Sequence, residues 1–237
     1  MCGIVGAIAK RNVVSILLQG LQRLEYRGYD SAGLVVVHDG KLQRVRSTGR
    51  VAELTEKSAT TTGHLGIAHT RWATHGAPSE RNAHPHLSND LIGVVHNGII
   101  ENYEEVRTRL TADGYVFTSD TDSEVIAHLI HSHYVRNKNL LAATQAALAE
   151  LVGAYAIGVV AADNPDLLVC ARKGSPLVIG IGDGEFFMAS DATPIIEYTK
   201  NVTYLEDNEI ASVIDGKLTV KISSPRMSRR CCRLQKM

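Results

Sequence analysis

VVVHDGKLQRV, residues 35–45, contains two β-rich runs on either side of Asp39-Gly40. An Asp-Gly pair supplies the positive φ angles that a two-residue hairpin turn requires. Two further apolar stretches are divided in the same way, by Asp183-Gly184 and by Asp215-Gly216. A fourth hairpin is predicted to join residues 154–162 to residues 167–172 through the polar residues 163–166. Repeated hairpins predict a mostly antiparallel sheet.

Helical spacing of apolar residues recurs between these strands. Leu17, Leu21 and Leu24 fall at i, i+4 and i+7, the spacing of one helix face. Three later helices are predicted around residues 103–110, 125–134 and 140–151, the first with Asn102 as its N-cap and Gly114 beyond its end. Hairpins mixed with helices predict an α+β fold in which helices cover the sheets.

The bulk composition is that of a globular domain. The chain has 237 residues, of which 44% are hydrophobic and 21% charged, and it is long enough to bury a core. Its apolar runs fall short of the roughly 18 residues that a membrane span needs. The apolar residues 1–9 follow no basic segment, so they are interpreted as a buried strand rather than a secretory signal. Four cysteines do not make a disulfide framework, which predicts a reducing, cytoplasmic setting.

Charge is distributed unevenly along the chain. The net charge is zero, but residues 223–237 hold four Arg and one Lys and no acid. The remaining chain therefore has a small excess of acids, which gives no electrostatic case for binding nucleic acid. Residues 223–237 differ in composition from the rest and are predicted to be a disordered tail. The domain itself is predicted to occupy residues 1–222.

Cys2 is the first candidate for chemistry. Its side chain is small, so Met1 is expected to be removed, which would leave Cys2 with a free α-amine beside its thiol. An α-amine with a pKa of about 7.7–8.0 can take the thiol proton near neutral pH and later return it to a leaving amine. The simpler interpretation is a buried cysteine in a first strand, so Cys2 needs partners elsewhere in the sequence.

Two polar clusters interrupt the structural pattern and offer such partners. Residues 68–76, AHTRWATHG, place Trp72, which is the only tryptophan, beside Arg71. An arginine fork suits a carboxylate, although a surface arginine packed on tryptophan is the plainer interpretation. Asn97-Gly98 could form a hairpin turn, or it could direct an amide and an N–H into a pocket as an oxyanion hole.

A third cluster precedes the helix expected near residue 125. In residues 119–124, SDTDSE, helix capping is the favoured role for Asp120 or Ser123, and an acid could equally bind an ammonium group. Histidines are densest at residues 84–86 and 128–133. The second group does not share one helix face, and no Cys or acid completes a set, so no metal is expected.

These clusters, taken with residues 27–33, carry a family resemblance. The chain resembles the N-terminal glutaminase domain of the glutamine–fructose-6-phosphate aminotransferase (glucosamine-6-phosphate synthase) family, a class II glutamine amidotransferase. The resemblance runs from Cys2 to about Ile222. The motifs occur in order: CGIVG at residues 2–6, LEYRGYDSAG at 24–33, TRWATHG at 70–76 and HNGIIEN at 96–102.

The resemblance implies an N-terminal-nucleophile hydrolase fold, which is a four-layer αββα sandwich with two antiparallel sheets. It implies that Cys2 attacks the side-chain amide of L-glutamine while Asn97 and Gly98 hold the oxyanion. No cofactor is implied. The substrate-binding residues that it implies are Asp122 for the α-ammonium, Arg71 with Thr74 and His75 for the α-carboxylate, and Trp72 in a loop that closes over glutamine. Arg27 and His84 match positions near the family's site, without an assigned step.

The resemblance covers only one part of the family enzyme. Two sugar-isomerase subdomains, through which full-length members are expected to form homo-oligomers, have no counterpart in this sequence. The chain is therefore expected to be a monomeric enzyme that performs the glutaminase half-reaction without making glucosamine 6-phosphate. Three alternatives stay open: an amidotransferase of the phosphoribosyl type, against which residues 27–33 argue, a non-catalytic glutamine-binding fragment, and an inert truncated gene product.

Overall fold

The computed structural model describes residues 2–28, 30–72, 77–223 and 235–236. The larger of two sheets contains, in spatial order, β14 (Gln235–Lys236), β11 (Asn201–Tyr204), β9 (Val178–Ile181), β10 (Phe186–Ala189), β1 (Gly3–Ile8), β4 (Leu65–Arg71), β2 (Ser31–His38) and β3 (Lys41–Thr48). The smaller contains β13 (Lys217–Ile222), β12 (Glu209–Ile214), β8 (Asn164–Lys173), β7 (Gly153–Ala161), β6 (Ile92–Ile100) and β5 (His86–Ser88). Neighbouring strands in both sheets run antiparallel.

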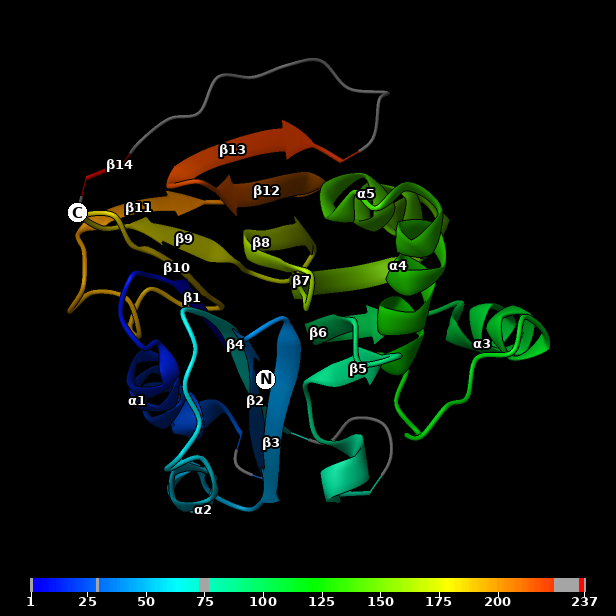
Figure 1. Ribbon diagram of the computed structural model, residues 1–237, viewed down its shortest axis with the longest axis horizontal. Helices are drawn as coiled ribbons and strands as arrows, with labels where there is room; N and C mark the ends of the chain where they lie inside the picture. The colour runs from blue at the N-terminus through cyan, green and yellow to red at the C-terminus, as the bar shows by residue number, and fades with distance from the viewer. Residues whose placement is uncertain (1, 29, 73–76, 224–234, 237) are drawn as a thin grey trace.

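Helices cover the outer faces of the sheets (Figure 1). On the larger sheet lie α1 (Val14–Leu24) and α2 (Val51–Lys57), and on the smaller sheet lie α4 (Glu124–Asn137) and α5 (Leu140–Glu150). α3 (Tyr103–Ala112) packs beside α4. Two 3-10 turns, Glu25–Arg27 and Glu80–Asn82, complete the regular structure of the described residues. The predicted αββα sandwich is confirmed.

Strand alternation divides the core into three apolar layers, because successive side chains point to opposite faces of a sheet. Val5, Leu34 and Ala68 pack beneath α1, whereas their neighbours Ile4, Val35 and Ile67 face the other sheet. The smaller sheet sends Val95 and Ala156 into the same inter-sheet layer and Val94 and Ile157 toward α4 and α5. Each fully buried aliphatic side chain contributes about 1.5–3 kcal/mol to the stability of the fold. Because each sheet buries apolar side chains on both of its faces, packing on both faces stabilises it.

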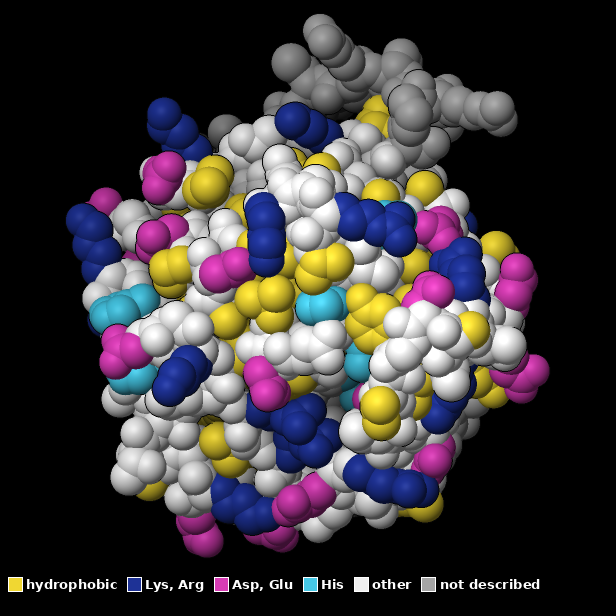
Figure 2. Space-filling view, turned by 45° about the vertical axis from the view of Figure 1, so that its right-hand side comes forward, with side chains coloured by type: hydrophobic (Ala, Val, Ile, Leu, Met, Phe, Trp, Pro, Cys, Tyr) yellow, Lys and Arg dark blue, Asp and Glu magenta, His cyan; other side chains and the backbone are white. Residues whose placement is uncertain are grey.

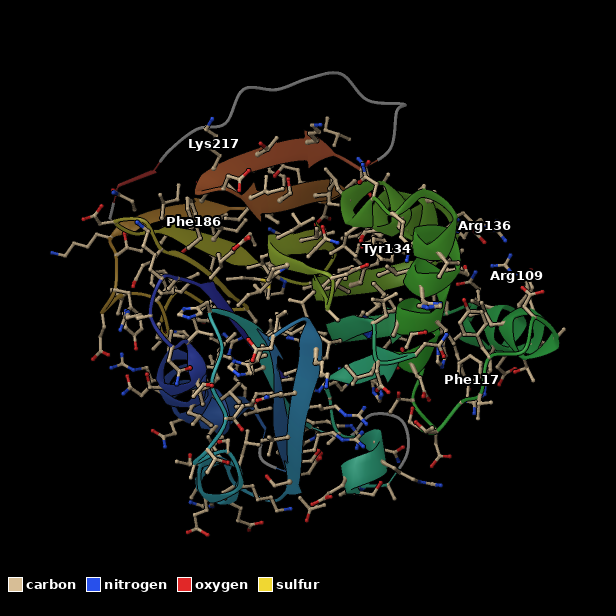
Figure 3. The ribbon with its side chains drawn as sticks, in the orientation of Figure 1. Arg109, Phe117, Tyr134, Arg136, Phe186 and Lys217 are labelled. Carbon is tan, nitrogen blue, oxygen red and sulfur yellow. The ribbon has the colours of Figure 1, made fainter. Side chains whose placement is uncertain are left out.

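Tyr134 shows how the helices are fixed to the sheet. Figure 3 places its side chain between α4 and the strands of the smaller sheet. The ring is fully buried, and its hydroxyl donates a hydrogen bond of 2.7 Å to Asp163 in the turn between β7 and β8. A buried tyrosine needs such a partner for its polar end.

The three predicted Asp-Gly hairpins are confirmed as β2–β3, β9–β10 and β12–β13. The fourth hairpin, β7–β8, also forms, but its predicted turn was wrong. The turn is Ala162-Asp163, and Asn164 is already paired with Ala161. Pro165 therefore stands at the second residue of β8, close to a strand start, where proline is tolerated.

The four predicted helices are confirmed as α1, α3, α4 and α5, while α2 was not predicted. Asn102 stands at the N-cap position of α3, but its side chain does not cap the helix. Instead, its amide donates to the Glu150 carbonyl and accepts from the Val152 N–H, each at 2.9 Å, and so ties the start of α3 to the end of α5. Gly114 follows α3 with a φ of +90°, as the sequence predicted.

Within the segment expected to be a disordered tail, Gln235–Lys236 form β14 beside β11. The rest of that segment, apart from Ser223, lies outside the described residues. On the face shown in Figure 2, acidic and basic side chains of the described residues are interspersed. None of the described helices is long and apolar enough to span a membrane.

Candidate active site

The candidate site lies at one end of the layer between the sheets, where polar side chains replace apolar ones. Residues two apart on a strand share a face. Ile4, Ile67 and Val95 face this layer. Continuing the alternation along β1, β4 and β6 therefore brings three polar side chains to the same end of the layer: Cys2, Arg71 and Asn97.

A cavity of about 240 Å³ opens among these residues. Eight of the predicted site residues line it: Cys2, Arg27, Arg71, Trp72, His84, Asn97, Gly98 and Asp122. Six further residues, which sequence reasoning did not select, complete its lining: His96, Ile99, Thr121, Ser123, Ser175 and Pro176. Thr74 and His75, also predicted, lie outside the described residues.

Cys2 is held by backbone contacts from a distant loop. The Trp72 N–H donates to the Cys2 sulfur at 3.2 Å, and the sulfur lies 3.5 Å from the Trp72 carbonyl oxygen. Burial raises the pKa of the Cys2 thiol, because the thiolate loses hydration, and the Trp72 N–H opposes that rise. The thiol is thus mostly protonated near neutral pH and requires a base to become a nucleophile.

Asn97 and Gly98 form part of β6, so the hairpin-turn interpretation of this pair was wrong. The Asn97 amide donates from Nδ2 to the Cys2 carbonyl oxygen at 3.0 Å. Gly98 has a φ of +138°, and a Cβ there would lie 2.0 Å from the Ala154 carbonyl oxygen. Only glycine fits this backbone position, since other residues are strained at such a φ.

Two arginines stand on the cavity wall. Arg71 ends β4 and is only 4% exposed, with Nη1 3.8 Å from an Asp30 carboxylate oxygen. The Arg27 guanidinium forms an ion pair with Asp191 and donates from Nε to the Tyr26 hydroxyl at 3.0 Å. Trp72 is 53% exposed. The buried arginine is therefore the one that could form a well-desolvated contact with an anion.

Asp122 lies in the loop before α4 and is buried. Its Oδ2 accepts the Ile100 N–H at 2.8 Å, and its Oδ1 accepts the Ser123 hydroxyl at 3.3 Å. His96 Nδ1 lies 2.8 Å from the same hydroxyl oxygen. These contacts fix a carboxylate at the cavity, opposite in charge to Arg71.

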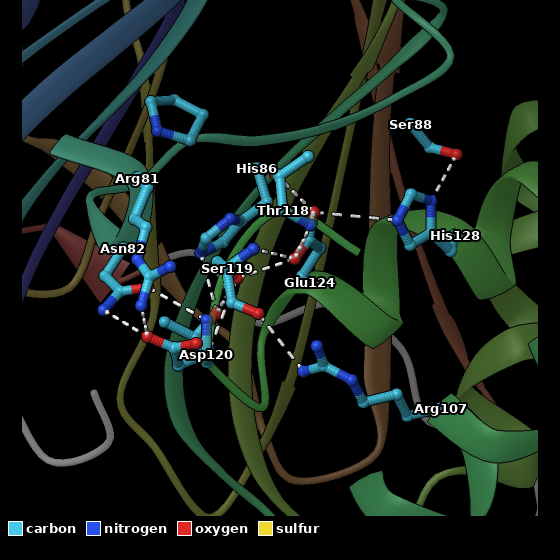
Figure 4. A network of polar contacts seen from close by, with 12 residues as sticks. Arg81, Asn82, His86, Ser88, Arg107, Thr118, Ser119, Asp120, Glu124 and His128 are labelled. Atoms are coloured by element: carbon cyan, nitrogen blue, oxygen red, sulfur yellow. Dashed lines mark hydrogen bonds and ion pairs between the residues drawn. The ribbon is translucent and has the colours of Figure 1, made fainter. Parts of the chain in front are cut away.

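The capping roles predicted for Asp120 and Ser123 were wrong. Ser123 occupies the N-cap position of α4 but makes no side-chain cap bond, because its hydroxyl serves Asp122 and His96. Asp120 forms an ion pair with Arg81 and accepts from the Asn82 amide. Both side chains thus hold the loop in place, and Figure 4 shows the contacts of Asp120 with Arg81 and Asn82.

Glu124 closes the loop that carries Asp122. Its buried carboxylate accepts the backbone N–H and hydroxyl groups of Thr118 and Ser119 at 2.7–3.1 Å, and His128 Nε2 lies 3.7 Å away (Figure 4). Burial alone would raise the pKa of Glu124, but these donors outweigh it and hold the pKa well below its usual range. The loop is thus pinned by a buried charge with a full set of donors.

Three buried histidines lie at the cavity: His84 and His96 line it, and His69 lies behind its wall. The rings of His69 and His84 stack with centroids 4.1 Å apart, and the His96 N–H donates to His84 Nδ1 at 3.3 Å. His69 and His96 were not selected from the sequence. His69 shares the face of β4 with Arg71, two residues on, and that alternation is the signal that would have indicated it.

No group of three or more His, Cys, Asp or Glu among the described residues is arranged to hold a metal ion.

The fold agrees with that of solved amidotransferases. The glutamine phosphoribosylpyrophosphate amidotransferase of B. subtilis, solved with ADP and GMP, superposes with a TM-score of 0.79 at 26% identity, over 96% of this chain and 50% of that one. A glutamine aminotransferase class-II domain protein from Silicibacter pomeroyi shares the fold alone, with a TM-score of 0.66 and 13% identity over 94% of this chain. The class is therefore that of the N-terminal-nucleophile amidotransferases.

The sequence model of the glutamine amidotransferase domain matches residues 69–197, and the chain belongs to this family. The glutamine–fructose-6-phosphate aminotransferase of Legionella pneumophila strain Paris is 52% identical over 97% of this chain, and that of Pseudomonas aeruginosa is 57% identical over 90%. The chain spans 39% and 35%, respectively, of the length of these two relatives.

Proposed function

We propose that this chain hydrolyses L-glutamine to glutamate and ammonia, with Cys2 as the nucleophile. The observation that supports this most strongly is that one cavity is lined by Cys2, Arg71, Asn97 and Asp122. A thiol, a guanidinium fork, an amide donor and a carboxylate correspond to the groups of glutamine that must be attacked or held. These are the amide carbon, the α-carboxylate, the developing oxyanion and the α-ammonium group.

The reaction begins with a proton transfer, because the thiol needs a base. We assign that role to the α-amine of Cys2, which removal of Met1 would release. The thiolate then adds to the side-chain amide carbon, and the oxygen takes negative charge beside Asn97 Nδ2 and the Gly98 N–H. Collapse of this intermediate breaks the C–N bond and releases ammonia, which carries the proton from the amine. Water hydrolyses the thioester, which yields glutamate and the free thiol.

The binding residues give the reaction its selectivity. Arg71 holds the α-carboxylate and Asp122 the α-ammonium, and Trp72 closes over the substrate from the cavity rim. Free glutamine carries both charges and can contact both residues, whereas a peptide or a simple amide would forgo at least one of these contacts. Thr74 and His75 stay predicted contributors to carboxylate binding.

The acceptor of the ammonia is proposed from the relatives. The proteins from Legionella pneumophila and Pseudomonas aeruginosa are named for transfer to fructose 6-phosphate, and we propose that ammonia released at this site serves that acceptor in a longer protein. Incubating the chain with glutamine and fructose 6-phosphate is expected to yield glutamate and ammonia but no amino sugar.

Intact-mass measurement combined with a glutaminase assay tests the central proposal. We expect a mass lacking Met1 and glutamate release that Cys2→Ala abolishes, while Cys170→Ala, which changes a buried core thiol, retains it. Undiminished activity in Cys2→Ala would overturn the proposal. A chain that retains Met1 and binds glutamine calorimetrically without hydrolysis would instead support the non-catalytic alternative.

A further inference from the structure

His69 contacts the proposed oxyanion-binding residue from outside the cavity. Its Nε2 lies 2.9 Å from Asn97 Oδ1 and 3.1 Å from the His96 carbonyl oxygen. Its ring is only 1% exposed, and its Nδ1 has no hydrogen-bond partner among the described residues. A buried ring nitrogen without a hydrogen-bond partner costs folding free energy. We therefore infer that the contacts at the other nitrogen, Nε2, serve the function of the site.

The contacts of Asn97 determine which way its amide points. Nδ2 lies 3.0 Å from the Cys2 carbonyl oxygen, which can only accept a hydrogen bond. The reversed amide would set two acceptor oxygens against each other at that distance. Oδ1 therefore faces His69, and both atoms near His69 Nε2 are acceptors.

His69 must consequently carry its proton on Nε2. Burial is the main cause that lowers the pKa of His69 to about 3, although the contact with Asn97 opposes it. The ring also stacks on His84 with an interplanar angle of 19°, and His84 is held by accepting the His96 N–H at Nδ1. The neutral Nε2–H tautomer is thus favoured by burial and by the two acceptors at Nε2.

We propose that His69 is a positioning residue that, through its Nε2–H, holds the Asn97 amide with its second Nδ2 hydrogen free for the oxyanion of the tetrahedral intermediate. The inference rests on the proposed glutaminase function and deepens it. The Nδ2 group has two hydrogens, and the Cys2 carbonyl takes one of them. Without His69, the amide can rotate, and the donor would have to be oriented again in each turnover, which pre-organised donors avoid.

A pair of substitutions at residue 69 separates this role from simple packing. His69→Leu fills the space of the ring with an apolar side chain but removes the donor. His69→Gln instead supplies an N–H to Asn97 Oδ1. We expect His69→Leu to lower kcat for glutamine by about 10²-fold, the size of losing one oxyanion donor, with KM changed less than about threefold. His69→Gln should recover most of that loss.

Alkylation of Cys2 by iodoacetamide provides a readout that the oxyanion does not enter, so its rate should be similar in wild type and both variants. His131→Leu is the matched control, since His131 is also a buried histidine but contacts Tyr115 and Asn89 rather than the site. It should change stability without changing kcat. Full activity in His69→Leu, or equal losses in both variants at residue 69, would overturn the proposal.

A spectroscopic measurement on the unsubstituted protein avoids any failure to fold. Long-range ¹H–¹⁵N NMR of the histidine-labelled chain should show His69 as the Nε2–H tautomer, unchanged from about pH 5 to 8. An Nδ1–H tautomer or a titrating ring would contradict the inference. Absence of glutamine hydrolysis by the wild type would count against the proposed function, whereas an active wild type with an unaffected His69→Leu variant would remove only the role of His69.

Discussion

The backbone N–H of Trp72 donates to the sulfur of Cys2 at 3.2 Å, although 70 residues separate them in the sequence. This contact joins the end of β4 to the residue before β1. It supplies the thiolate with a donor where partial burial of Cys2 limits hydration. Burial and this donor shift the pKa of the Cys2 thiol in opposite directions, and burial is the larger effect.

The first prediction follows from that balance. Because burial raises the pKa of the thiol, the thiolate fraction should still be increasing above about pH 8. In a Cys231→Ser, Cys232→Ser background, the rate of Cys2 alkylation by iodoacetamide should rise steadily through that range. Cys170, whose burial raises the pKa of its thiol to about 12, serves as the internal control and should stay unlabelled. A rate that is flat above about pH 7 would show an activated thiolate instead.

The second prediction concerns Asp122. Asp122→Asn keeps an oxygen for the Ile100 N–H but removes the charge proposed to hold the α-ammonium. A charge-assisted contact is worth about 1.5–3 kcal/mol, so KM for glutamine should rise roughly 10- to 100-fold. Asp120→Asn, which changes the neighbouring carboxylate paired with Arg81, should leave KM unchanged.

Substrate analogues sharpen the test of Asp122. N-acetylglutamine lacks the ammonium charge, so the wild type should hydrolyse it at least about 100-fold less efficiently than glutamine. In Asp122→Asn the preference for glutamine over N-acetylglutamine should become smaller, because only glutamine has an ammonium group whose contact is lost. A preference that survives the substitution in full would place ammonium recognition elsewhere.

The third prediction tests the fork of Arg71. Lysine keeps the charge but cannot form two parallel hydrogen bonds to a carboxylate. Arg71→Lys should therefore raise KM for glutamine by about tenfold or more while Cys2 alkylation proceeds normally. Arg81→Lys is the exposed counterpart, and its kinetics should match the wild type.

The fourth prediction concerns the backbone at Gly98. An alanine Cβ would meet the Ala154 carbonyl oxygen at 2.0 Å with φ at +138°, so β6 and β7 would have to separate. We expect Gly98→Ala to destabilise the fold by roughly 3 kcal/mol or more, as measured by urea unfolding. Gly40→Ala, at a φ of +71° with open space around it, should cost only about 1 kcal/mol. Equal losses would show that φ alone, and not the Ala154 contact, requires glycine.

The fifth prediction is a pH dependence of stability. The pKa of Glu124 is lower in the folded protein than in the unfolded chain, since its hydrogen-bond donors outweigh its burial. Its stabilisation is therefore fully present above the ordinary glutamate pKa of 4.5 and is lost as the pH falls below that value. Glu124→Gln should lower the free energy of unfolding at pH 7, by about 1–3 kcal/mol, and the difference from wild type should shrink in acid.

Glu105→Gln, on the exposed side of α3, is the control for this linkage and should show no such trend. If the difference in unfolding free energy between wild type and Glu124→Gln stays constant down to about pH 3, the pKa of Glu124 is not lowered by folding, which would contradict the prediction.

Local signals in the sequence predicted the hairpins and most helices well. Asp39-Gly40 sets positive φ angles whatever the rest of the chain does, and the spacing of Leu17, Leu21 and Leu24 needs only one apolar neighbour. The capping errors at two helix starts arose because other groups engaged the side chains that were expected to cap. Asn102 and Ser123 have the chemistry of N-caps, yet Glu150, Val152, Asp122 and His96 engage their side chains instead.

The sequence by itself determined the residue types of the site and the family to which the chain belongs, because motifs such as TRWATHG and HNGIIEN are contiguous in the chain. Only the tertiary structure decided which of those residues meet. β1 and β4 pair in the larger sheet, and β6 faces them from the smaller sheet. Strand alternation then directs Cys2, Arg71 and Asn97 into the layer between the sheets. The contact of His69 with Asn97 was decided in the same way, since a hydrogen bond between two sheets leaves no mark in the local sequence.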